Sequence, residues 1–284
     1  MHTKISNSKL SVQIKSKGAE LFSLKNNVTQ RELIWEGNSD FWGKHSPVLF
    51  PIVGTLKNNT YRFENKEYQL PRHGFARDLE FKIVYQTENE VIFSLSSDEN
   101  TAKLFPFKFE LQMHYILIDA TLKLSYSVKN LDNKTLPFSI GAHPAFALPF
   151  EFENYSLQFE HQETLKSCTL ENDLLSDKTF EIKLENKNLP LSYSLFANDA
   201  LIFKTLKSKF ITIVETENPI LKISFSDFKN LGIWTKPNAK FICIEPWLGY
   251  SDTIHSNGNL SEKDGIQIVK ENQTFCCSFS IEIL

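Results

Sequence analysis

The chain lacks the features of several protein classes. It has no apolar run of about 18 residues, the length a membrane-spanning helix needs, and its opening segment, MHTKISNSKLSVQIKSKG, lacks the apolar core of a secretion signal. The 31 basic and 34 acidic side chains give a net charge of −3, and no basic run is long enough to follow a phosphate backbone. We therefore expect a cytoplasmic protein that binds neither membranes nor nucleic acid.

Cysteine is also scarce. The four cysteines, Cys168, Cys243, Cys276 and Cys277, show no C-x-x-C spacing, which argues against a zinc knuckle, a redox pair or a disulfide framework. We expect free thiols. Cys276 and Cys277 are adjacent in an apolar segment, so a strand would point them to opposite faces.

The 284 residues include only ten glycines and eleven prolines, but clusters of Asn, Asp and Lys divide the chain repeatedly. Strand-like alternation lies between these clusters. It is clearest in FKFELQMHYILI and ATLKLSYSV, which a turn near Asp119 would join into an antiparallel pair. Further candidates are SVQIKS, VIFSLSS, NYSLQFE, FITIVET, ILKISFS, FICIE and TFCCSFSIEI.

Helical patterns are weak, and the best is a short turn at DENTAKL that Asp98 would cap. An all-β chain of this length must pack its sheets face to face to bury its apolar side chains. The sequence therefore predicts a large antiparallel β-sandwich with few short helices. No linker or repeat interrupts it, so we expect a single domain over residues 1–284.

Two histidines lie in motifs that interrupt this alternation. His73 lies between Arg72 and Arg77 in PRHGFAR, and nearby positive charge favours a neutral imidazole that bonds to a polarised oxygen. A surface turn explains the same motif equally well. His143, in GAHPAF, precedes a proline that favours extended backbone, and its small neighbours leave room for a ligand. A buried histidine satisfied within the core is the alternative.

The most informative segment is FICIEPW. Alternation puts Glu245 on the same strand face as Phe241 and Cys243, with Trp247 two residues further and Trp234 upstream. Burial near aromatic rings raises the pKa of a carboxyl, which would make Glu245 a general base near neutral pH. A carboxylate satisfied by backbone N–H groups or a lysine is the alternative.

Together these residues predict a small-polyol site, because aromatic faces accept the apolar side of a sugar ring and polar groups bind its hydroxyls. A two-histidine, one-carboxylate metal site made of His73, His143 and Glu245 is an alternative, although no paired-ligand spacing supports it. A serine hydrolase and a glycosidase are less favoured, because the chain has no G-x-S-x-G motif and no obvious second carboxylate beside Glu245.

The chain resembles the aldose 1-epimerase, or galactose mutarotase-like, family, and in detail its LacX-type bacterial branch. The resemblance covers nearly the whole length. It rests on the motifs GAELFSL, FWGKHSPVLFPIVG, RHGFARD, FPFKFEL, GAHPAF, NDALIFK and GIWTKPNAKFICIEPWLGYSD in this order.

The resemblance implies a β-supersandwich and an enzyme that interconverts the α and β anomers of an aldose by ring opening and closure, without a cofactor or metal. It also implies roles for individual residues: Glu245 as the base, His143 as the acid at the ring oxygen, and His73 as a second histidine near that oxygen. Asp199 is the implied ligand of a sugar hydroxyl, Arg77 is a further expected substrate-binding residue, and Trp247 is the expected stacking face. The expected partner is a small-molecule sugar, and the expected state is a monomer or homodimer.

One position departs from the family pattern. Relatives of the LacX type usually have arginine where this chain has Thr55, in PIVGTL, so a substrate contact is expected to differ. Arg77 would replace it in part. A hexose-6-phosphate mutarotase and a non-catalytic sugar-binding protein on the same fold are the alternatives.

Overall fold

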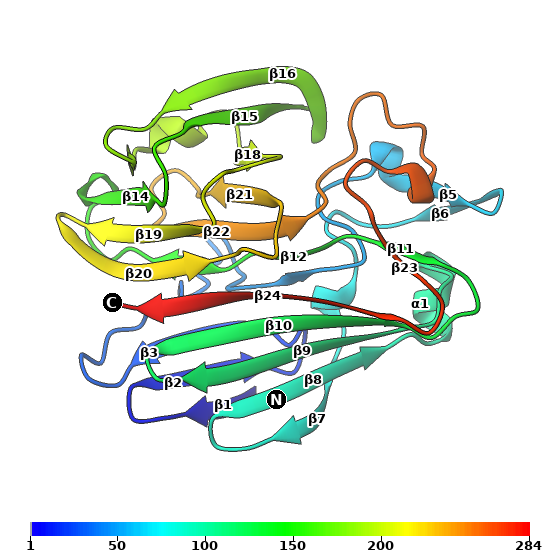
Figure 1. Ribbon diagram of the computed structural model, residues 1–284, viewed down its shortest axis with the longest axis horizontal. Coiled ribbons are helices and arrows are strands. Elements are labelled where there is room, and N and C mark those ends of the chain that lie inside the picture. The colour runs from blue at the N-terminus through cyan, green and yellow to red at the C-terminus, as the bar shows by residue number, and fades with distance from the viewer. Residues whose placement is uncertain (1) are drawn as a thin grey trace.

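The computed structural model describes residues 2–284, and most of its regular structure is β-strand. The largest sheet has nine antiparallel strands, seen in part across the lower half of Figure 1. In spatial order these are β17 (Asn188–Pro190), β14 (Tyr155–Phe159), β19 (Phe210–Glu215), β20 (Asn218–Ser224), β24 (Thr274–Ile283), β10 (Thr121–Asn130), β9 (Phe109–Ile118), β8 (Glu90–Ser96) and β7 (Lys82–Gln86).

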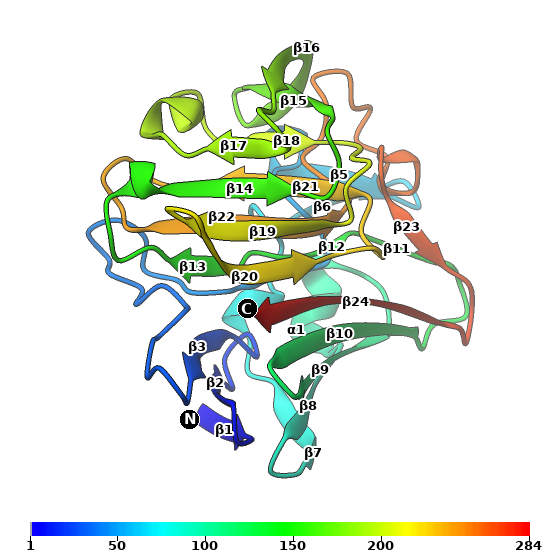
Figure 2. The same ribbon diagram turned by 60° about the vertical axis from the view of Figure 1, so that its left-hand side comes forward.

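A second antiparallel sheet faces one half of the first, and Figure 2 shows β14, β19 and β20 as a layer in front of β21 and β22. Its strands, in spatial order, are β16 (Leu174–Lys183), β15 (Thr164–Glu171), β18 (Leu201–Phe203), β21 (Asn230–Trp234), β22 (Phe241–Leu248), β12 (Ile140–Ala142) and β4 (Val48–Leu49), with β13 (Ala145–Ala147) also paired to β22. The two sheets form the large antiparallel β-sandwich that the sequence predicts.

The remaining strands form three smaller sheets. They are β1 (His2–Ser6) with β2 (Leu10–Lys15) and β3 (Leu21–Asn26), β5 (Thr60–Phe63) with β6 (Lys66–Gln69), and β11 (Leu136–Phe138) with β23 (Gln267–Val269).

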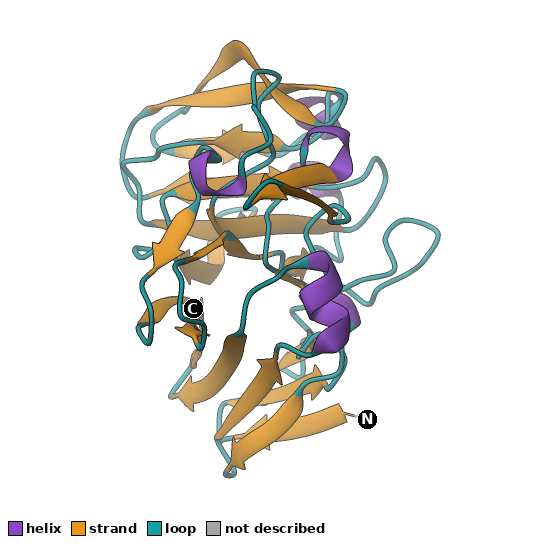
Figure 3. Cartoon of the chain, turned by 90° about the vertical axis from the view of Figure 1, so that its right-hand side faces the viewer, coloured by secondary structure: helices purple, strands orange, loops and turns teal. Residues whose placement is uncertain are grey.

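Helices are short and peripheral, as Figure 3 shows. They are α1 (Glu99–Leu104) and the 3-10 turns η1 (Lys57–Asn59), η2 (Ala76–Asp78), η3 (Phe152–Asn154), η4 (Tyr193–Phe196) and η5 (Leu260–Glu262). The Asp98 carboxylate accepts the N–H groups of Asn100 and Thr101 at the start of α1, so the predicted cap is confirmed. None of the helices in residues 2–284 has the length and apolarity needed to span a bilayer.

The hairpin of β9 and β10 shows how the sequence determines burial. Phe109 and Tyr115 on β9 are buried in alternation with partly exposed neighbours, and Asp119 makes the turn with a φ of 50°. The strand begins two residues later than the alternation suggests, because the Phe107 N–H bonds to the carbonyl of Phe105 instead of a neighbouring strand. One hydrophobic core runs from Ile5 to Ile281.

The predicted free thiols are confirmed: Cys276 is exposed and Cys277 buried, as their opposite faces on β24 require.

Candidate active site

A cavity of about 410 Å³ lies on the side of the eight-stranded sheet that faces away from the main core. Its polar and aromatic lining residues are Trp42, Arg72, His73, Arg77, His143, Asp199, Trp234, Lys236, Glu245, Trp247 and Ser251. The six site residues predicted from the sequence are all among them, although they come from four separate stretches of the chain.

Strand β22 presents the carboxyl group to this cavity. All eight of its residues are buried, because it runs through the middle of the sheet between β21 and the β12–β13 segment. Ile242 and Ile244 belong to the main core, whereas Cys243 and Glu245 point to the opposite face. A shift of one residue in register would exchange these two faces.

Glu245 is 2% exposed, and burial raises the pKa of its carboxyl group well above the ordinary value. The positive charge of Arg72 acts against this rise, and the negative charge of Asp199 adds to it. Its Oε2 atom is buried without a hydrogen-bond partner. The carboxyl group therefore holds a proton more tightly than one in water.

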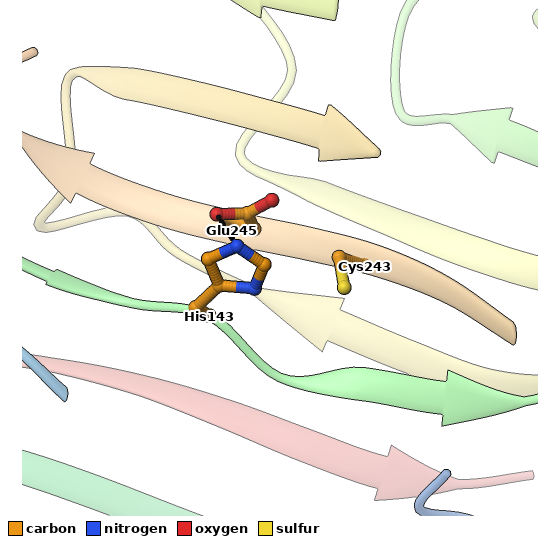
Figure 4. A group of neighbouring side chains, drawn as sticks. All are labelled: His143, Cys243 and Glu245. Carbon is orange, nitrogen blue, oxygen red and sulfur yellow. Dashed lines mark ion pairs between the residues drawn. The ribbon is translucent and has the colours of Figure 1, made fainter. Parts of the chain in front are cut away.

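His143 lies in the link between β12 and β13, and its Nε2 atom is 3.2 Å from Glu245 Oε2 (Figure 4). This is an ion-pair distance rather than a directed hydrogen bond, and Nδ1 on the other side of the ring is also unpaired. Burial lowers the pKa of the imidazole to about 3. An acid with a raised pKa beside a base with a lowered pKa can share one transferable proton.

His73 approaches the same space from the loop between β6 and η2. Its Nδ1 accepts the backbone N–H of Gly54 at 3.1 Å, so the neutral ring carries its hydrogen on Nε2. Burial lowers the pKa of His73 well below its usual value, and the charges of His143, Arg72 and Arg77 lower it further. The prediction of a neutral His73 agrees with this environment.

The tautomer of His73 creates a place for an oxygen atom. Arg72 Nε also lies within hydrogen-bond distance of His73 Nε2, at 3.3 Å. A neutral imidazole accepts at only one nitrogen, and the shorter contact is the one from Gly54, so in this tautomer Arg72 Nε and His73 Nε2 are both donors. An acceptor oxygen between them would receive a hydrogen bond from each. The His73 and His143 rings meet edge to face with centroids 5.9 Å apart, so this position adjoins the His143–Glu245 pair.

Two tryptophans form the aromatic wall beside that pair. Trp42 stacks on His143 with ring centroids 4.7 Å apart and an interplanar angle of 26°. Trp234 packs edge to face against both rings, with its centroid 5.6 Å from that of Trp42 and 5.8 Å from that of His143. No sequence pattern marked Trp42 as a site residue, although it lies in the FWGKH motif that is shared with the family.

Trp247, the predicted stacking face, is more deeply packed. It is 6% exposed, and a Cβ atom on Gly141 or Gly232 would approach its ring to 2.6 or 2.5 Å. Glycine at these two positions on the flanking strands β12 and β21 therefore makes room for the indole. Trp247 lines the cavity floor, but packing accounts for most of its surface.

Charged side chains other than Glu245 also line the cavity. Asp199 is half-buried in the turn before β18 and accepts the N–H of Ala200, with a φ of 87°. Arg77, in η2, donates to the Arg72 carbonyl at 2.8 Å and keeps its buried Nε without a hydrogen-bond partner. Lys236, which the sequence analysis did not single out, adds a third cation to this lining.

Thr55, the position that departs from the family pattern, does not line the cavity. The wall there consists of Gly54 and Ser251. Thr55 N–H donates to the Ser251 hydroxyl at 3.0 Å, and the Thr55 hydroxyl is buried without a partner.

The two-histidine metal site is not formed. Among residues 2–284, the side chains close enough to share an ion are His143, Cys243 and Glu245, whose ligand atoms lie within 4.8 Å of one another. His73 is outside this group because its ring is anchored to Gly54.

The arrangement suits proton transfer to and from oxygen atoms. A buried acid–base pair, a neutral histidine donor and an aromatic wall meet in one cavity.

Comparison with known proteins gives a consistent result. The model of the aldose 1-epimerase family matches residues 1–272. The chain is 34% identical to the chromosomal protein LacX of Lactococcus lactis subsp. lactis over 302 aligned positions, which cover all of both chains.

Solved structures show the same similarity. A galactose mutarotase related enzyme from Lactobacillus acidophilus superposes with a TM-score of 0.95 at 33% identity, over 100% of this chain and 97% of that one. A galactose mutarotase-like protein from Lactobacillus casei gives 0.92 at 29% identity over all of both chains.

Proposed function

The chain belongs to the aldose 1-epimerase family, an isomerase family, and has its galactose mutarotase-like β-supersandwich fold, and from this premise we propose that it interconverts the α and β anomers of an aldose. The observation that carries the proposal is the buried contact between His143 and Glu245 at the cavity wall. The hydroxyl and ring oxygens of an anomeric centre are bonded to the same carbon. A base and an acid that serve them must therefore lie close together, as these two groups do.

Glu245 is the proposed base. When the proton shared by the pair lies on His143, the Glu245 carboxylate takes the proton of the C1 hydroxyl while His143 gives its proton to the ring oxygen. The bond between C1 and the ring oxygen breaks, and its electron pair stays on that oxygen. A C1 carbonyl forms from the former hydroxyl, and the product is the open-chain aldehyde.

Ring closure reverses these transfers. Rotation about the C1–C2 bond presents the other face of the carbonyl, so closure yields either anomer. Glu245 then returns its proton to the carbonyl oxygen and His143 recovers the proton from the hydroxyl. The pair ends as it began, so no outside proton donor is consumed.

The other lining residues have proposed binding roles. The Nε2–H of His73, together with Arg72, would hold the ring oxygen or a neighbouring hydroxyl. Asp199 and Arg77 would bind hydroxyls on the far side, and the Trp42–Trp234 wall would contact the apolar face of the sugar. Trp247 would form the floor of the site.

Polarimetry on freshly dissolved α-glucose or α-galactose tests the proposal. We expect anomer equilibration to accelerate in proportion to protein concentration, and His143→Asn to lower the acceleration, because an amide cannot transfer a proton at useful cost. Sugar binding without acceleration would instead support the non-catalytic sugar-binding protein.

A phosphorylated aldose is the second candidate substrate. Three cations, Arg72, Arg77 and Lys236, line a cavity whose carboxyl groups are Asp199 and Glu245, and an anionic substituent would be attracted to the excess of positive charge. Anomer-resolved NMR with glucose and with glucose 6-phosphate distinguishes a free aldose substrate from a phosphorylated one. A higher kcat/KM for the phosphate ester that falls with Lys236→Met would favour the phosphorylated substrate.

A further inference from the structure

We propose that His143, Cys243 and Glu245 form a binding site for a thiophilic divalent cation such as Zn²⁺ or Cd²⁺, and that the bound ion blocks the proposed proton transfer. The site offers one nitrogen, one sulfur and one oxygen ligand within 4.8 Å of one another. Figure 4 shows the three side chains gathered over β22. The binding itself does not depend on the proposed function, whereas the block of turnover rests on it.

The donor set selects the type of ion. Thiolate and imidazole favour Zn²⁺ and related soft or borderline ions, whereas Mg²⁺ and Ca²⁺ require mainly oxygen ligands. Cys243 supplies the sulfur that distinguishes this group from an ordinary histidine–carboxylate pair. It is a free thiol, and Cys168 and Cys277 are not part of the cluster.

The ligand atoms are available to an ion. Glu245 Oε2 is buried and has no hydrogen-bond partner, and His143 Nε2 lies 3.2 Å from it, so coordination would satisfy a buried polar atom instead of competing with an existing hydrogen bond. Binding displaces the thiol proton of Cys243 and any proton held by the His143–Glu245 pair, and these protons pass to the solvent.

The distances require little movement. Zinc bonds of about 2.0–2.3 Å in a tetrahedral site place the ligand atoms about 3.3–3.8 Å apart. His143 and Glu245 already lie 3.2 Å apart, and the widest pair in the cluster is within 4.8 Å. Small rotations of the Cys243 and Glu245 side chains would close this gap without moving the backbone.

The three ligands lie on or beside paired strands, and the fourth coordination position faces the cavity. Cys243 and Glu245 share one face of β22, and Ala145, two residues after His143, pairs with Cys243. Cys243 is fully buried behind the pair, while His143 and Glu245 line the cavity. A water or a sugar hydroxyl can therefore take the fourth position from the cavity side.

Cd²⁺ titration of the full chain tests the binding directly, since cadmium thiolates show an ultraviolet charge-transfer band. Cys276→Ala serves as the background, because that exposed thiol would add its own signal. In this background we expect a saturable band that persists with Cys168→Ala, a matched buried thiol. We expect Cys243→Ala to abolish the band. The proposal would be overturned if the Cys276→Ala protein showed no band, or if the band persisted after Cys243→Ala was added.

Polarimetry supplies the functional readout. We expect Zn²⁺ to suppress anomer equilibration and EDTA to restore it. Cys243→Ala should keep the metal-free rate and need at least about 100-fold more Zn²⁺ for the same suppression, since even outer ligand partners contribute 10–100-fold to metal affinity. Equal sensitivity in the two proteins would contradict the proposed block. If Cys243→Ala is unstable, Cys243→Ser preserves the side-chain size and is expected to lose the Cd²⁺ band.

The two hypotheses fail in different ways. A charge-transfer band without any acceleration of mutarotation would refute the epimerase and leave the metal site. Mutarotation without a band would refute the metal site and leave the epimerase.

Discussion

Glu245 and His143 owe their proposed chemistry to burial at the cavity wall. In water a carboxyl group and an imidazole have separate pKa values of about 4.3 and 6.5. Here burial raises the pKa of the Glu245 carboxyl group and lowers the pKa of the His143 imidazole. Glu245 Oε2 and His143 Nε2 lie 3.2 Å apart. Each group therefore becomes able to exchange a proton with the other or with a bound oxygen.

Replacing Glu245 with glutamine should keep the fold and lower kcat by roughly 10² to 10⁴, the usual contribution of a positioned general base. The amide has nearly the same shape, so the buried space stays filled. Polarimetry gives the rate and circular dichroism checks the fold. A variant with the wild-type rate would remove Glu245 from the mechanism.

The pH profile of kcat/KM should be nearly flat between pH 7 and pH 5. A second proton adds to the His143–Glu245 pair only near the lowered pKa of His143, about 3, so the active singly protonated pair persists at pH 5. Initial rates corrected for the spontaneous reaction measure this. A loss of about 30-fold by pH 5 would mean that the imidazole titrates near its ordinary pKa of about 6.5.

At the scale of elements, the segment at 38–46, between β3 and β4, holds the aromatic wall in place. Glu20 accepts the N–H groups of His45 at 2.8 Å and Ser46 at 3.2 Å, and Trp42 from the same segment stacks on His143. The His45 carbonyl in turn accepts the N–H of Ala145 at the start of β13. A largely buried carboxylate outside the cavity lining thus holds the segment that carries Trp42, and this segment in turn bonds to the strand after His143.

Glu20→Gln should destabilise the protein at neutral pH by about 3 kcal/mol and by much less at acid pH. Burial acts to raise the pKa of Glu20, but hydrogen bonds and charge from His45 lower it to about 2. Because the folded pKa lies below the unfolded value of 4.5, the stabilisation is present above pH 4.5 and is lost as the pH falls toward 2.

Urea unfolding at pH 7 and pH 3 measures this difference, and Glu271→Gln, at an exposed position, is the control. The gap between wild type and Glu20→Gln should narrow at pH 3, whereas the control should match wild type at both values. An equal gap at both pH values would show that the carboxylate charge is not the stabilising feature.

At the scale of the whole molecule, a buried ion pair holds a carboxylate that also bonds to a segment distant in sequence. Lys263 Nζ lies 2.9 Å from Asp252 Oδ1, and both side chains are 3% exposed. Lys263 also donates to the Tyr250 carbonyl, while Asp252 accepts the N–H of Lys57 and donates its own N–H to Thr55. The chain after β22 is thereby tied to the chain after β4, beside the cavity wall.

Lys263→Met should cost about 3–5 kcal/mol of unfolding free energy, because it leaves the Asp252 carboxylate buried without its counter-charge. Lys178→Met is the matched control. It removes an ion pair with Glu171 whose side chains are 80% and 48% exposed, and we expect it to cost at most about 1 kcal/mol. Denaturant unfolding measures the free energy of unfolding of both variants. If both variants lose a similarly small amount, water reaches the Asp252 carboxylate and replaces the lost ion pair.

The sequence by itself determined the features that depend on local periodicity and turn chemistry. Alternation predicted the β9–β10 hairpin, the all-β class and the face of β22 that carries Glu245. Charge and neighbouring residues marked His73, and GAHPAF marked His143. The single domain over residues 1–284 stays a prediction, supported by a hydrophobic core that extends from Ile5 to Ile281.

Only the tertiary structure decided which of these residues meet. Trp42 lies about a hundred positions from His143 and Cys243 another hundred beyond it, and no local pattern encodes their contact. The same holds for Glu20 under the site and for Thr55, whose hydroxyl turns away from the cavity. The physical reason is that alternation specifies which face of a strand is buried, whereas the partner of that face depends on how distant strands pair and pack.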